Sequence, residues 1–407
     1  MEEEDEIEYQ PISVKELLMN MKNYAWLMVN LAYSSIIYND ETLAAEVLEL
    51  EKVVDRLDIL LNMQAALATR SADDAEKMVS IFRLATATNK ISDAAADIAF
   101  IVFSKIKVPR DVILSLFESE ETITRAIVDK KYDGSRLGNF IRRKNYVIDV
   151  IAVRRGKNIF LEPDENFIIR YNDALLLKGN VESIKDFMNS IGLDYSISKK
   201  TASDKYREII NDLIQLKNTS LVMVDIAYTA MLTKSEELAE RIKEFENYVD
   251  VMLEEFSKKI ISSEKLSIDE KYGAMRLAIA SEEISDAALL MVQPLLAGLE
   301  PHPIIVDVVG ETFERISVIE MDKEDDGKTL SELGYSKRGI IVLAVRRNDD
   351  WIVMPPYSSF VVKDGDVLIV KYISESESII DELEREEDRE EIIEDIQEEE
   401  WEEEEED

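Results

Sequence analysis

Apolar side chains recur along much of the chain at alternating spacings of three and four residues. The first stripe runs from Leu17 to Leu31, the second from Leu43 to Leu61, and the third from Ile81 to Ile98. This spacing places the side chains of each stripe on one face of a helix. Short polar segments rich in Asp and Ser, which suit helix N-caps, separate the stripes. The sequence therefore predicts three helices packed as an antiparallel bundle within residues 12–107.

The pattern changes after Pro109 to the alternation that is typical of strands. Two short helices, Leu137–Arg143 and Val181–Met188, are expected to flank these strands. The segment is therefore predicted to be a small α+β module. Its strands are expected at Tyr146–Val153, Asn158–Leu161, Phe167–Tyr171 and Ala174–Lys178.

The same order of elements returns in the second half of the chain. Ile91-Ser92-Asp93-Ala94-Ala95 recurs unchanged 193 positions later, as residues 284–288, and other landmarks recur at nearly the same distance. We interpret the chain as one unit of roughly 190 residues that has been duplicated. The expected elements are helices at 206–232, 235–261 and 268–296, followed by strands at Phe313–Glu320, Ile340–Arg346, Trp351–Val353 and Val367–Tyr372.

Composition and charge restrict the classes of partner. The net charge is −38, with acidic residues concentrated at the N-terminus and after residue 380, so nucleic acid and anionic lipid are expected to be repelled. There is no Cys, which excludes disulfides and thiolate chemistry. No apolar run approaches the ~18 residues that a membrane span needs. We expect a soluble, cytoplasmic protein.

Acidic residues lie four residues apart on the second helix of each half and on the third helix of the second half, and Asn89 and Asp93 have the same spacing on the third helix of the first half. Side chains at this spacing face the same way, and like charges there repel unless a cation lies between them. One interpretation is a divalent-metal or iron site built from neighbouring helices. The other is a set of salt bridges to residues such as Lys90 or Arg276. The candidate ligands are Glu51, Asp55 and Asp93, with Asn89 in the fourth place, in the first half, and Glu246, Asp250, Glu282 and Asp286 in the second.

Two arginine pairs lie at the ends of equivalent strands. Arg154-Arg155 and Arg346-Arg347 could bind a phosphate or carboxylate effector through bidentate contacts. Alternatively they are charges on edge strands that oppose aggregation. No catalytic constellation surrounds His302, which is the single histidine, and no glycine-rich phosphate loop occurs. The chain is therefore not expected to be an enzyme.

The helical halves resemble the PhoU family, whose three-helix repeats carry Glu-x-x-x-Asp motifs on helices two and three. Glu51-Lys52-Val53-Val54-Asp55 and Glu246-Asn247-Tyr248-Val249-Asp250 correspond to the motif on helix two. Residues 89–93 and 282–286 correspond to the motif on helix three. The resemblance implies metal-holding acids and a role in regulating phosphate transport. Asn89 departs from the pattern, as do Ala94 and Ala287 where the family has His.

The α+β modules are similar to the TrkA-C domain, the C-terminal domain of RCK regulators of potassium transport. The second module carries Gly327-Lys328-Thr329-Leu330-Ser331-Glu332-Leu333-Gly334, Pro355-Pro356 and Asp364-Gly365-Asp366. In the first module Asn172-Asp173 replaces the Gly-Asp turn, so this copy is interpreted as degraded. Such domains pair and bind small effectors in the cleft between them. Archaeal proteins of this architecture are commonly related to potassium transport.

These patterns predict an α+β multidomain chain in which two PhoU-like three-helix units form one bundle, with each unit followed by a TrkA-C-like module. We expect the modules to pair with each other or across a homodimer, leaving a cleft near Arg346 and Asp366. The expected segments are an acidic N-terminal stretch (1–11), helical unit 1 (12–107), module 1 (108–190), a linker (191–203), helical unit 2 (204–299), module 2 (300–374) and an acidic tail (375–407).

Three functions follow as hypotheses. The first is a non-enzymatic regulatory subunit of a potassium-type cation channel or transporter. It would sense an unknown small effector or ion and reach the membrane through its integral membrane partner. The second is a PhoU-like metal-binding regulator of phosphate or divalent-cation transport. The third is an enzyme that uses a carboxylate-bridged metal.

Overall fold

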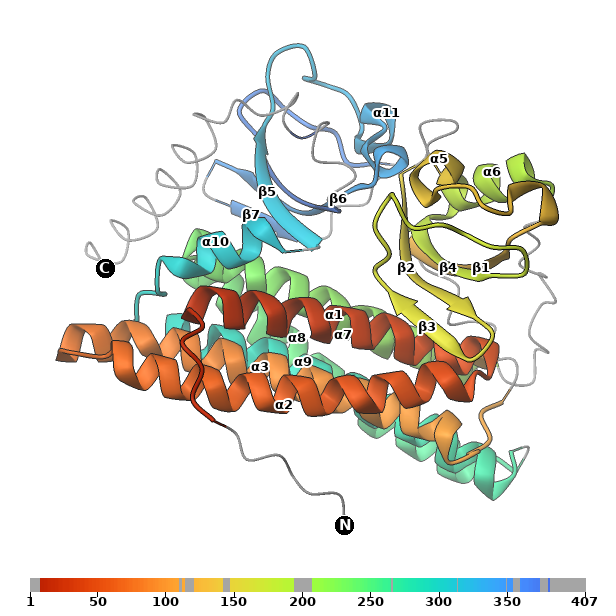
Figure 1. Ribbon diagram of the computed structural model, residues 1–407. Coiled ribbons are helices and arrows are strands. Elements are labelled where there is room, and N and C mark those ends of the chain that lie inside the picture. Colours follow the sequence, from red (N-terminus) through yellow and green to blue (C-terminus); the bar gives the residue numbers. More distant parts are fainter. Residues whose placement is uncertain are drawn as a thin grey trace. The chain divides into compact units, whose positions relative to one another are not determined.

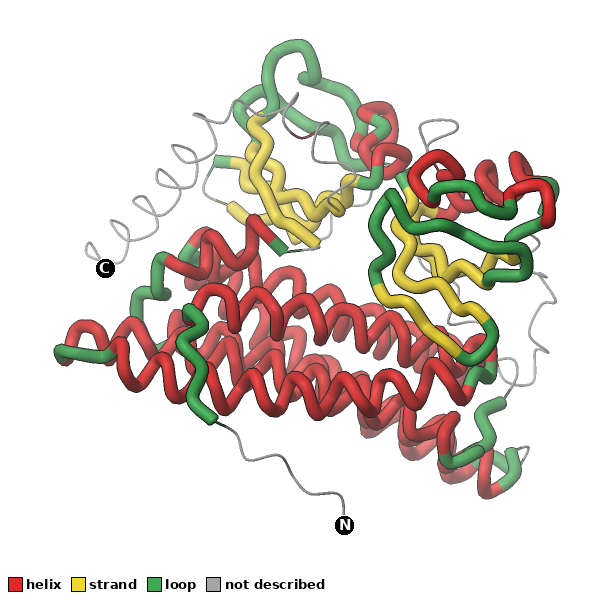
Figure 2. The backbone as a smooth tube through the Cα atoms, in the orientation of Figure 1, coloured by secondary structure: helices red, strands yellow, loops and turns green. Residues whose placement is uncertain are grey.

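The computed structural model describes residues 8–109, 112–113, 121–141, 147–193, 207–264, 266–312, 314–348, 350–353, 359–373 and 380. They divide between a helical unit, from Met1–Pro109 and Asn211–Ser317, and a sheet unit, from Arg110–Ile210 and Val318–Glu386. Figure 1 labels the elements of both units, and Figure 2 separates helices from strands by colour. No helix in the described ranges is both long and apolar enough to cross a membrane.

Six long helices of the described chain build the helical unit, as the apolar stripes predicted. Asp40 and Ser71 cap the second and third helix, because their side chains accept hydrogen bonds from backbone N–H groups of the first turn. The boundaries lie within a few residues of those expected. The helices are α1 (Val14–Tyr38), α2 (Glu41–Ala68), α3 (Ala72–Phe103), α7 (Arg207–Thr233), α8 (Glu236–Ser262) and α9 (Ile268–Leu296).

The two helix trios pack into one bundle through an extensive contact between α3 and α9. The prediction of a single bundle is therefore confirmed. The repeated Ile-Ser-Asp-Ala-Ala stretch lies on these two helices, and Ala94, Ala95, Ala287 and Ala288 are completely buried. Small side chains let two helix backbones approach closely, so the same sequence serves both sides of the interface.

Two lysines make reciprocal contacts across the bundle. The Nζ atom of Lys22 on α1 lies 4.9 Å from the ring centroid of Tyr228 on α7. The Nζ atom of Lys217 on α7 lies 5.1 Å from the ring centroid of Tyr33 on α1. Both distances are within the range of a cation–π interaction. Each half thus supplies the cation for the ring of the other half, as a twofold relation between the trios requires.

The segment that leaves each trio crosses the third helix of the other trio. The carbonyl oxygen of Lys107 lies so close to Gly273 on α9 that a Cβ atom there would come within 2.2 Å of it. The backbone N–H of His302 donates to the Ser80 hydroxyl on α3, with an N–O distance of 2.9 Å. Ser80 and Gly273 are 193 positions apart, the same offset as the repeated stretch.

A helix that the sequence did not predict, α10 (Ile304–Glu311), lies on α1. Lys15 of α1 forms ion pairs with Asp307 at 3.1 Å and with Glu311 at 2.9 Å. Lys22 donates to the Thr312 hydroxyl and, at 2.7 Å, to the carbonyl of Glu314. These contacts fix the chain from the end of α9 to the first residue of the following strand.

Each module contains a four-stranded sheet. The first sheet has the order β1-β4-β2-β3 and the second β5-β8-β6-β7, so the two orders are identical. Irregularities also match, because the register shifts between Val150 and Ala152 in one sheet and between Val342 and Ala344 in the other. The strands are β1 (Glu121–Ile127), β2 (Ile148–Arg155), β3 (Asn158–Leu161), β4 (Ala174–Asn180), β5 (Glu314–Glu320), β6 (Ile340–Arg347), β7 (Asp350–Val353) and β8 (Val367–Ile373).

Three expectations about the sheets were wrong. The sequence reading missed β1, whose alternation is carried partly by threonine. It placed a strand at Phe167–Tyr171, where the structure has a single bridge between Arg136 and Ile168. The alternative interpretation of the arginine pairs as charges on edge strands was also wrong, because β2 and β6 each lie between two other strands.

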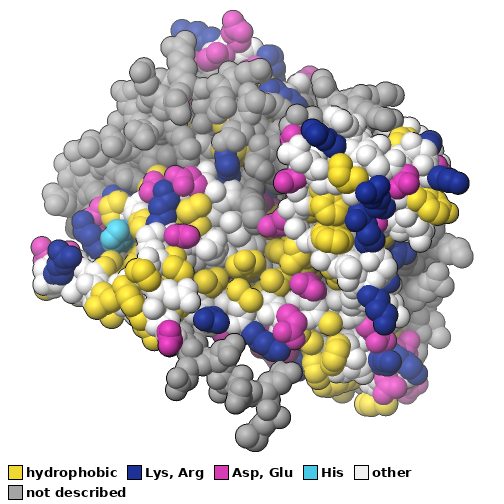
Figure 3. Space-filling view, viewed as in Figure 1, with side chains coloured by type: hydrophobic (Ala, Val, Ile, Leu, Met, Phe, Trp, Pro, Cys, Tyr) yellow, Lys and Arg dark blue, Asp and Glu magenta, His cyan; other side chains and the backbone are white. Residues whose placement is uncertain are grey.

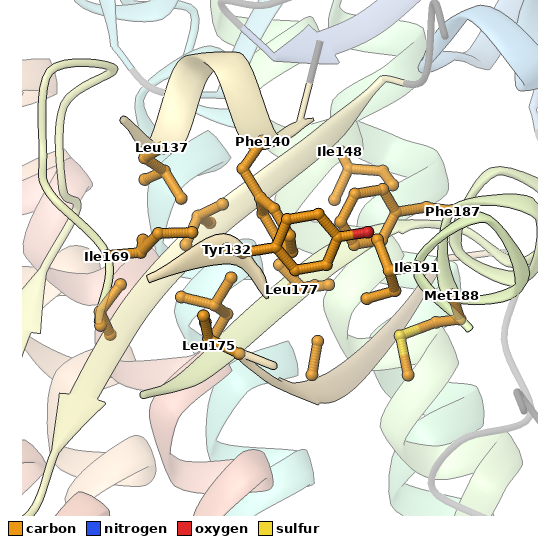
Figure 4. Packing of buried hydrophobic residues seen from close by; sticks show 14 of the residues in the cluster. Tyr132, Leu137, Phe140, Ile148, Ile169, Leu175, Leu177, Phe187, Met188 and Ile191 are labelled. Carbon is orange, nitrogen blue, oxygen red and sulfur yellow. The ribbon is translucent and has the colours of Figure 1, made fainter. Parts of the chain in front are cut away.

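Short helices complete each module around its own core. In module 1, α6 (Val181–Ile191) and α5 (Leu137–Ile141) cover the sheet, and Phe140 packs edge-on against Tyr132 and Phe187 with centroid distances of 4.8 and 5.5 Å (Figure 4). In module 2, the core gathers around Leu330 and Tyr335, from α11 (Leu330–Leu333) and the turn that follows it.

Several expected segments lie wholly or mostly outside the described residues. They are the N-terminal stretch up to residue 7, most of the linker at 191–203, the Pro355-Pro356 motif and the acidic tail apart from Ile380.

The close contact at Gly273 predicts the sign of the stability change that Gly273→Ala causes. In an isolated helix, Gly→Ala stabilises by about 0.5–1 kcal/mol. In this chain the added methyl group meets the Lys107 carbonyl, so we expect Gly273→Ala to lower the free energy of unfolding by about 1–3 kcal/mol. Urea unfolding followed by circular dichroism measures the change. Thr86→Ala, at an exposed position of α3, is the control and should be neutral or slightly stabilising. A stabilised Gly273→Ala variant would contradict the crossing.

Candidate functional site

The acids of the second half gather between α8 and α9. Burial, with Asp286 and Asp250 nearby, raises the pKa of Glu282 to about 7. Burial and the same two aspartates also raise the pKa of Glu246. The four carboxyl groups, which we call the second acidic cluster, therefore lie close enough to repel one another.

The acids of the first half form an equivalent group between α2 and α3. Burial, followed by Asp93 and Asp55, raises the pKa of Glu51, and burial with Asp55 raises the pKa of Asp93. Glu51, Asp55, Asn89 and Asp93 make up the first acidic cluster. The Oδ1 atom of Asn89 is buried and has no hydrogen-bond partner among the described residues.

Two further acids join the first acidic cluster that the sequence reading did not include. Asp97 and Asp58 both contribute to raising the pKa of Asp93. A signal for both was present, since Asp58 lies three residues after Asp55 and Asp97 lies four residues after Asp93.

The two cations that the sequence reading named as salt-bridge partners both contact these acids. Lys90 on α3 donates to Oδ2 of Asp286 on α9. Arg276 on α9 donates to Oδ1 of Asp97 on α3 at 2.7 Å. Both pairs join one half of the chain to the other. On the face in Figure 3, basic and acidic side chains likewise lie intermixed.

The residue types suit a hard divalent cation, because carboxylate and amide oxygens are its preferred ligands. Within the described ranges, however, no three His, Asp or Glu side chains are arranged to hold a metal ion. The second acidic cluster also has a lysine ammonium on one of its oxygens. Metal binding by Glu51, Asp55, Asp93 and the second-half acids stays a prediction.

The second arginine of each pair binds an aspartate of its own module. The Arg347 guanidinium makes a two-point contact with Asp366, with Nε–Oδ1 at 2.7 Å and Nη2–Oδ2 at 2.6 Å. Arg155 makes the same contact with Asp173 at 2.9 and 2.8 Å. Both aspartates are almost completely buried, so each pair holds the turn before the last strand.

The first arginine of each pair, Arg154 or Arg346, is described by a different observation in each module. Arg154 donates through Nε to the carbonyl of Gly156 at 3.1 Å, a local contact within its hairpin. Arg346 is half-buried on β6. A role of Arg154, Arg155, Arg346, Arg347 or Asp366 in effector binding therefore stays a prediction, and the structure gives Arg155, Arg347 and Asp366 a structural role.

Module 2 contains an open cavity of about 420 Å³, and neither Arg346, Arg347 nor Asp366 lines it. It lies beside α11 and the turn that follows. The Tyr335 hydroxyl is buried and has no hydrogen-bond partner among the described residues, and burial raises the pKa of Tyr335 to about 12. The lining residues are Asp325, Lys328, Glu332, Leu333, Tyr335 and Arg338.

The acids of this cavity already have partners. Lys328 donates to Asp325 at 2.6 Å. Glu332 accepts from the backbone N–H and the hydroxyl of Thr329, both at 2.8 Å, in a capping box that starts α11. Of the lining groups, the Tyr335 hydroxyl is the one that is buried without a hydrogen-bond partner among the described residues. The motif at residues 327–334 was recognised from the sequence, but the burial of the Tyr335 hydroxyl was not, because burial depends on the folded core.

His302, the single histidine, has a structural position. Its Nδ1 atom accepts from the backbone N–H of Ile304 at 3.1 Å, which satisfies a donor at the start of α10. Burial, with Lys77 nearby, lowers the pKa of His302. The neutral ring therefore acts as a cap for α10.

Comparisons with known proteins identify two domains. Residues 18–102 match the model of the PhoU domain, and residues 316–383 match the model of the TrkA-C domain. The chain therefore carries one domain of each kind. No curated protein matches the chain.

Similar solved structures include two PhoU proteins and a channel. PhoU from Pseudomonas aeruginosa is 15% identical, with 70% of this chain and 96% of that chain covered and a TM-score of 0.38. The phosphate transport system regulatory protein PhoU from Streptococcus pneumoniae is 11% identical, with 70% and 91% covered and a TM-score of 0.36. The GsuK channel bound to NAD is 11% identical, with 76% and 65% covered and a TM-score of 0.19.

One titratable residue of module 1, Glu162, was not among the site residues predicted from the sequence. Glu162 follows β3 with a left-handed φ of 42°, and its N–H donates to the Ile151 carbonyl at 2.9 Å. Burial, with Asp149 nearby, raises the pKa of Glu162 to about 8. A strained backbone and a raised pKa at one residue are features that concentrate at functional positions.

Glu162 makes the stability of module 1 depend on pH. Its folded pKa lies above its ordinary value of 4.5, so the folded state binds the extra proton and stability falls as pH rises from about 4.5 to about 8. We expect Glu162→Gln to raise the free energy of unfolding at pH 9 by about 2 kcal/mol, after discounting for solvent screening, and to leave it unchanged at pH 5. Urea unfolding at both pH values measures this. The exposed Glu165→Gln is the control. An equal effect at both pH values would contradict the assignment.

Proposed function

We propose that this chain is a non-enzymatic regulatory subunit of a potassium-type cation channel or transporter. In this proposal it senses a small anionic effector through module 2 and acts at the cytoplasmic side of its membrane partner. The TrkA-C domain at 316–383 supports association with a cation channel or transporter, and the PhoU domain at 18–102 supports a regulatory role in transport.

The observation that carries the effector proposal is the cavity of the TrkA-C domain, because Tyr335, one of its lining residues, has a buried hydroxyl without a hydrogen-bond partner among the described residues. A buried hydroxyl without a partner costs about 1–3 kcal/mol, and a ligand that accepts its hydrogen bond recovers part of that. Such a group is therefore poised to bind a ligand oxygen.

The lining of the cavity favours an anionic group on the effector. Asp325 is neutralised by Lys328, and Glu332 is held by the N-terminus of α11. Arg338 adds a guanidinium, whose positive charge lowers the pKa of Tyr335 against the larger effects of burial and of the Asp325 carboxylate. A carboxylate or phosphate accepts hydrogen bonds from both groups, and charge-assisted bonds of this kind are the stronger ones.

The resemblance between the halves supports two further parts of the proposal. Equal strand orders, matching register shifts and equivalent Arg–Asp pairs favour descent of the two halves from one duplicated unit. Pairing of the modules, within the chain or across a homodimer, follows from the resemblance to TrkA-C domains.

A second candidate is a PhoU-like metal-binding regulator of phosphate or divalent-cation transport. The first acidic cluster favours it, because burial and mutual repulsion raise the pKa values of Glu51 and Asp93 and the Asn89 oxygen has no described partner. A bound cation would relieve the repulsion.

The effector proposal predicts opposite effects of one substitution on stability and on binding. Tyr335→Phe removes the partnerless hydroxyl, so it should raise the free energy of unfolding by about 1 kcal/mol. The same change should weaken effector binding about tenfold, as should Arg338→Gln. Thermal shifts with inorganic phosphate, citrate and nucleoside phosphates provide the measurement. Tyr171→Phe, at an exposed tyrosine of module 1, is the control.

Two outcomes of these measurements would contradict the proposal. One is a wild-type protein that none of these anions stabilises. The other is binding that persists in both cavity variants. The transporter is tested separately: the tagged full chain should recover an integral membrane cation channel from detergent-solubilised membranes, and deletion of residues 318–373 should abolish recovery.

A further inference from the structure

The two acidic clusters are equivalent in position but differ in one nearby residue. Lys90 precedes the repeated stretch on α3, and its counterpart 193 positions later on α9 is Glu283. One half therefore carries a positive charge where the other carries a negative one. In a twofold-related pair of helices, such an exchange distinguishes two sites that are otherwise alike.

Lys90 does not neutralise the acids of its own half. Its ammonium donates to Oδ2 of Asp286, across the contact between α3 and α9. The side chains of Lys90 and Asp286 are 37% and 33% exposed, so the pair is partly screened from water. The lysine of the first half thus serves the second acidic cluster.

The same ammonium lies within electrostatic range of other acids on α8 and α9. Its charge offsets part of the repulsion at Glu246 and at Glu282. It also offsets repulsion at Glu283, where Arg276 contributes in the same sense. Four acids of the second half therefore share one tethered cation, counting Asp286.

A divalent metal ion would compete with this ammonium. Metal ligation places carboxylate oxygens about 2.0–2.6 Å from the ion, and an oxygen that holds Lys90 cannot approach a metal in the same direction. Displacing the lysine would also leave an ammonium without its partner at the α3–α9 contact.

Among the described residues, the acids at Glu51, Asp55 and Asp93 have no lysine in the place of Lys90, and the cross-bundle cation of the first half, Arg276, donates instead to Asp97 at 2.7 Å. The cation that acts on Glu51 is Lys52, which is the weakest influence on it, and Lys52 donates to Glu49 at 2.9 Å on the exposed side of α2. Glu283, the counterpart of Lys90, lies near Asp97 and Asp93, and its negative charge cannot neutralise them.

We propose that Lys90 is the resident counter-ion of the second acidic cluster, which closes this cluster to divalent metal ions and clamps α3 to α9. Under this proposal the second half does not bind a divalent metal ion, although it has four acids and the first half has Asn89 in one of the four places. It involves neither the cavity of module 2 nor the Tyr335 hydroxyl, so it stands or falls independently of the effector proposal.

Manganese titration of the full chain after chelator treatment tests the proposal, with bound Mn²⁺ counted from the electron paramagnetic resonance signal of the free ion. Wild type and Asp286→Asn should bind the same number of equivalents. Lys90→Met, which keeps the length of the side chain and removes its charge, should bind one equivalent more. That gain should disappear in the double variant Lys90→Met/Asp286→Asn.

Lys52→Met is the matched control, because it removes a lysine from the same bundle at an exposed position and should add no equivalent. The proposal is overturned if Asp286→Asn loses an equivalent that wild type and Asp93→Asn retain. It is also overturned if folded Lys90→Met binds the same number as wild type. If circular dichroism shows that Lys90→Met does not fold, the comparison of wild type with Asp286→Asn and Asp93→Asn decides alone.

Discussion

The contact between α3 and α9 is the constraint on which the rest of the helical unit depends. It brings together two copies of one short sequence, whose alanines are completely buried, and it sets each trio against the other. The exit segments then have to cross the opposite third helix, at Gly273 and at Ser80. Only a very small residue fits at the first crossing, since the carbonyl of Lys107 occupies the space that a side chain would need.

Polar groups inside the bundle follow the same reciprocal scheme. Burial raises the pKa of Tyr33 to about 12, and the Ser281 hydroxyl on α9 opposes that rise, although the Tyr33 hydroxyl has no hydrogen-bond partner among the described residues. Burial raises the pKa of Tyr228 too, and the Thr88 hydroxyl on α3 opposes it. Each tyrosine thus lies near a hydroxyl on the third helix of the other trio. The symmetry is broken mainly at the helix-three acids, where Lys90 faces Glu283 and Asn89 replaces Glu282.

The sequence predicted the helices well because their apolar spacing is a local property. It also identified the acids that meet on neighbouring helices, and Lys90 and Arg276 as alternative partners. It failed where structure depends on distant contacts. The helix α10 follows prolines that suggest a loop, and it is held by Lys15 and Lys22 from the other half of the chain. The position of β2 and β6 inside their sheets could not follow from alternation alone, since alternation does not show which strand is the neighbour. The Tyr335 hydroxyl and the left-handed Glu162 likewise depend on the completed core.

The segment from α10 to the start of β5 is held on α1 by two lysines. Lys22 contacts the ring of Tyr228 and also binds the Glu314 carbonyl at the first residue of β5. A shift of α1 against α7 would therefore move the contact at the start of that strand, because one ammonium makes both interactions. Lys15 fixes α10 to the same helix through two carboxylates, so α10 and α1 should move together. Two lysines of α1 therefore hold the segment that runs from α10 to the first residue of β5.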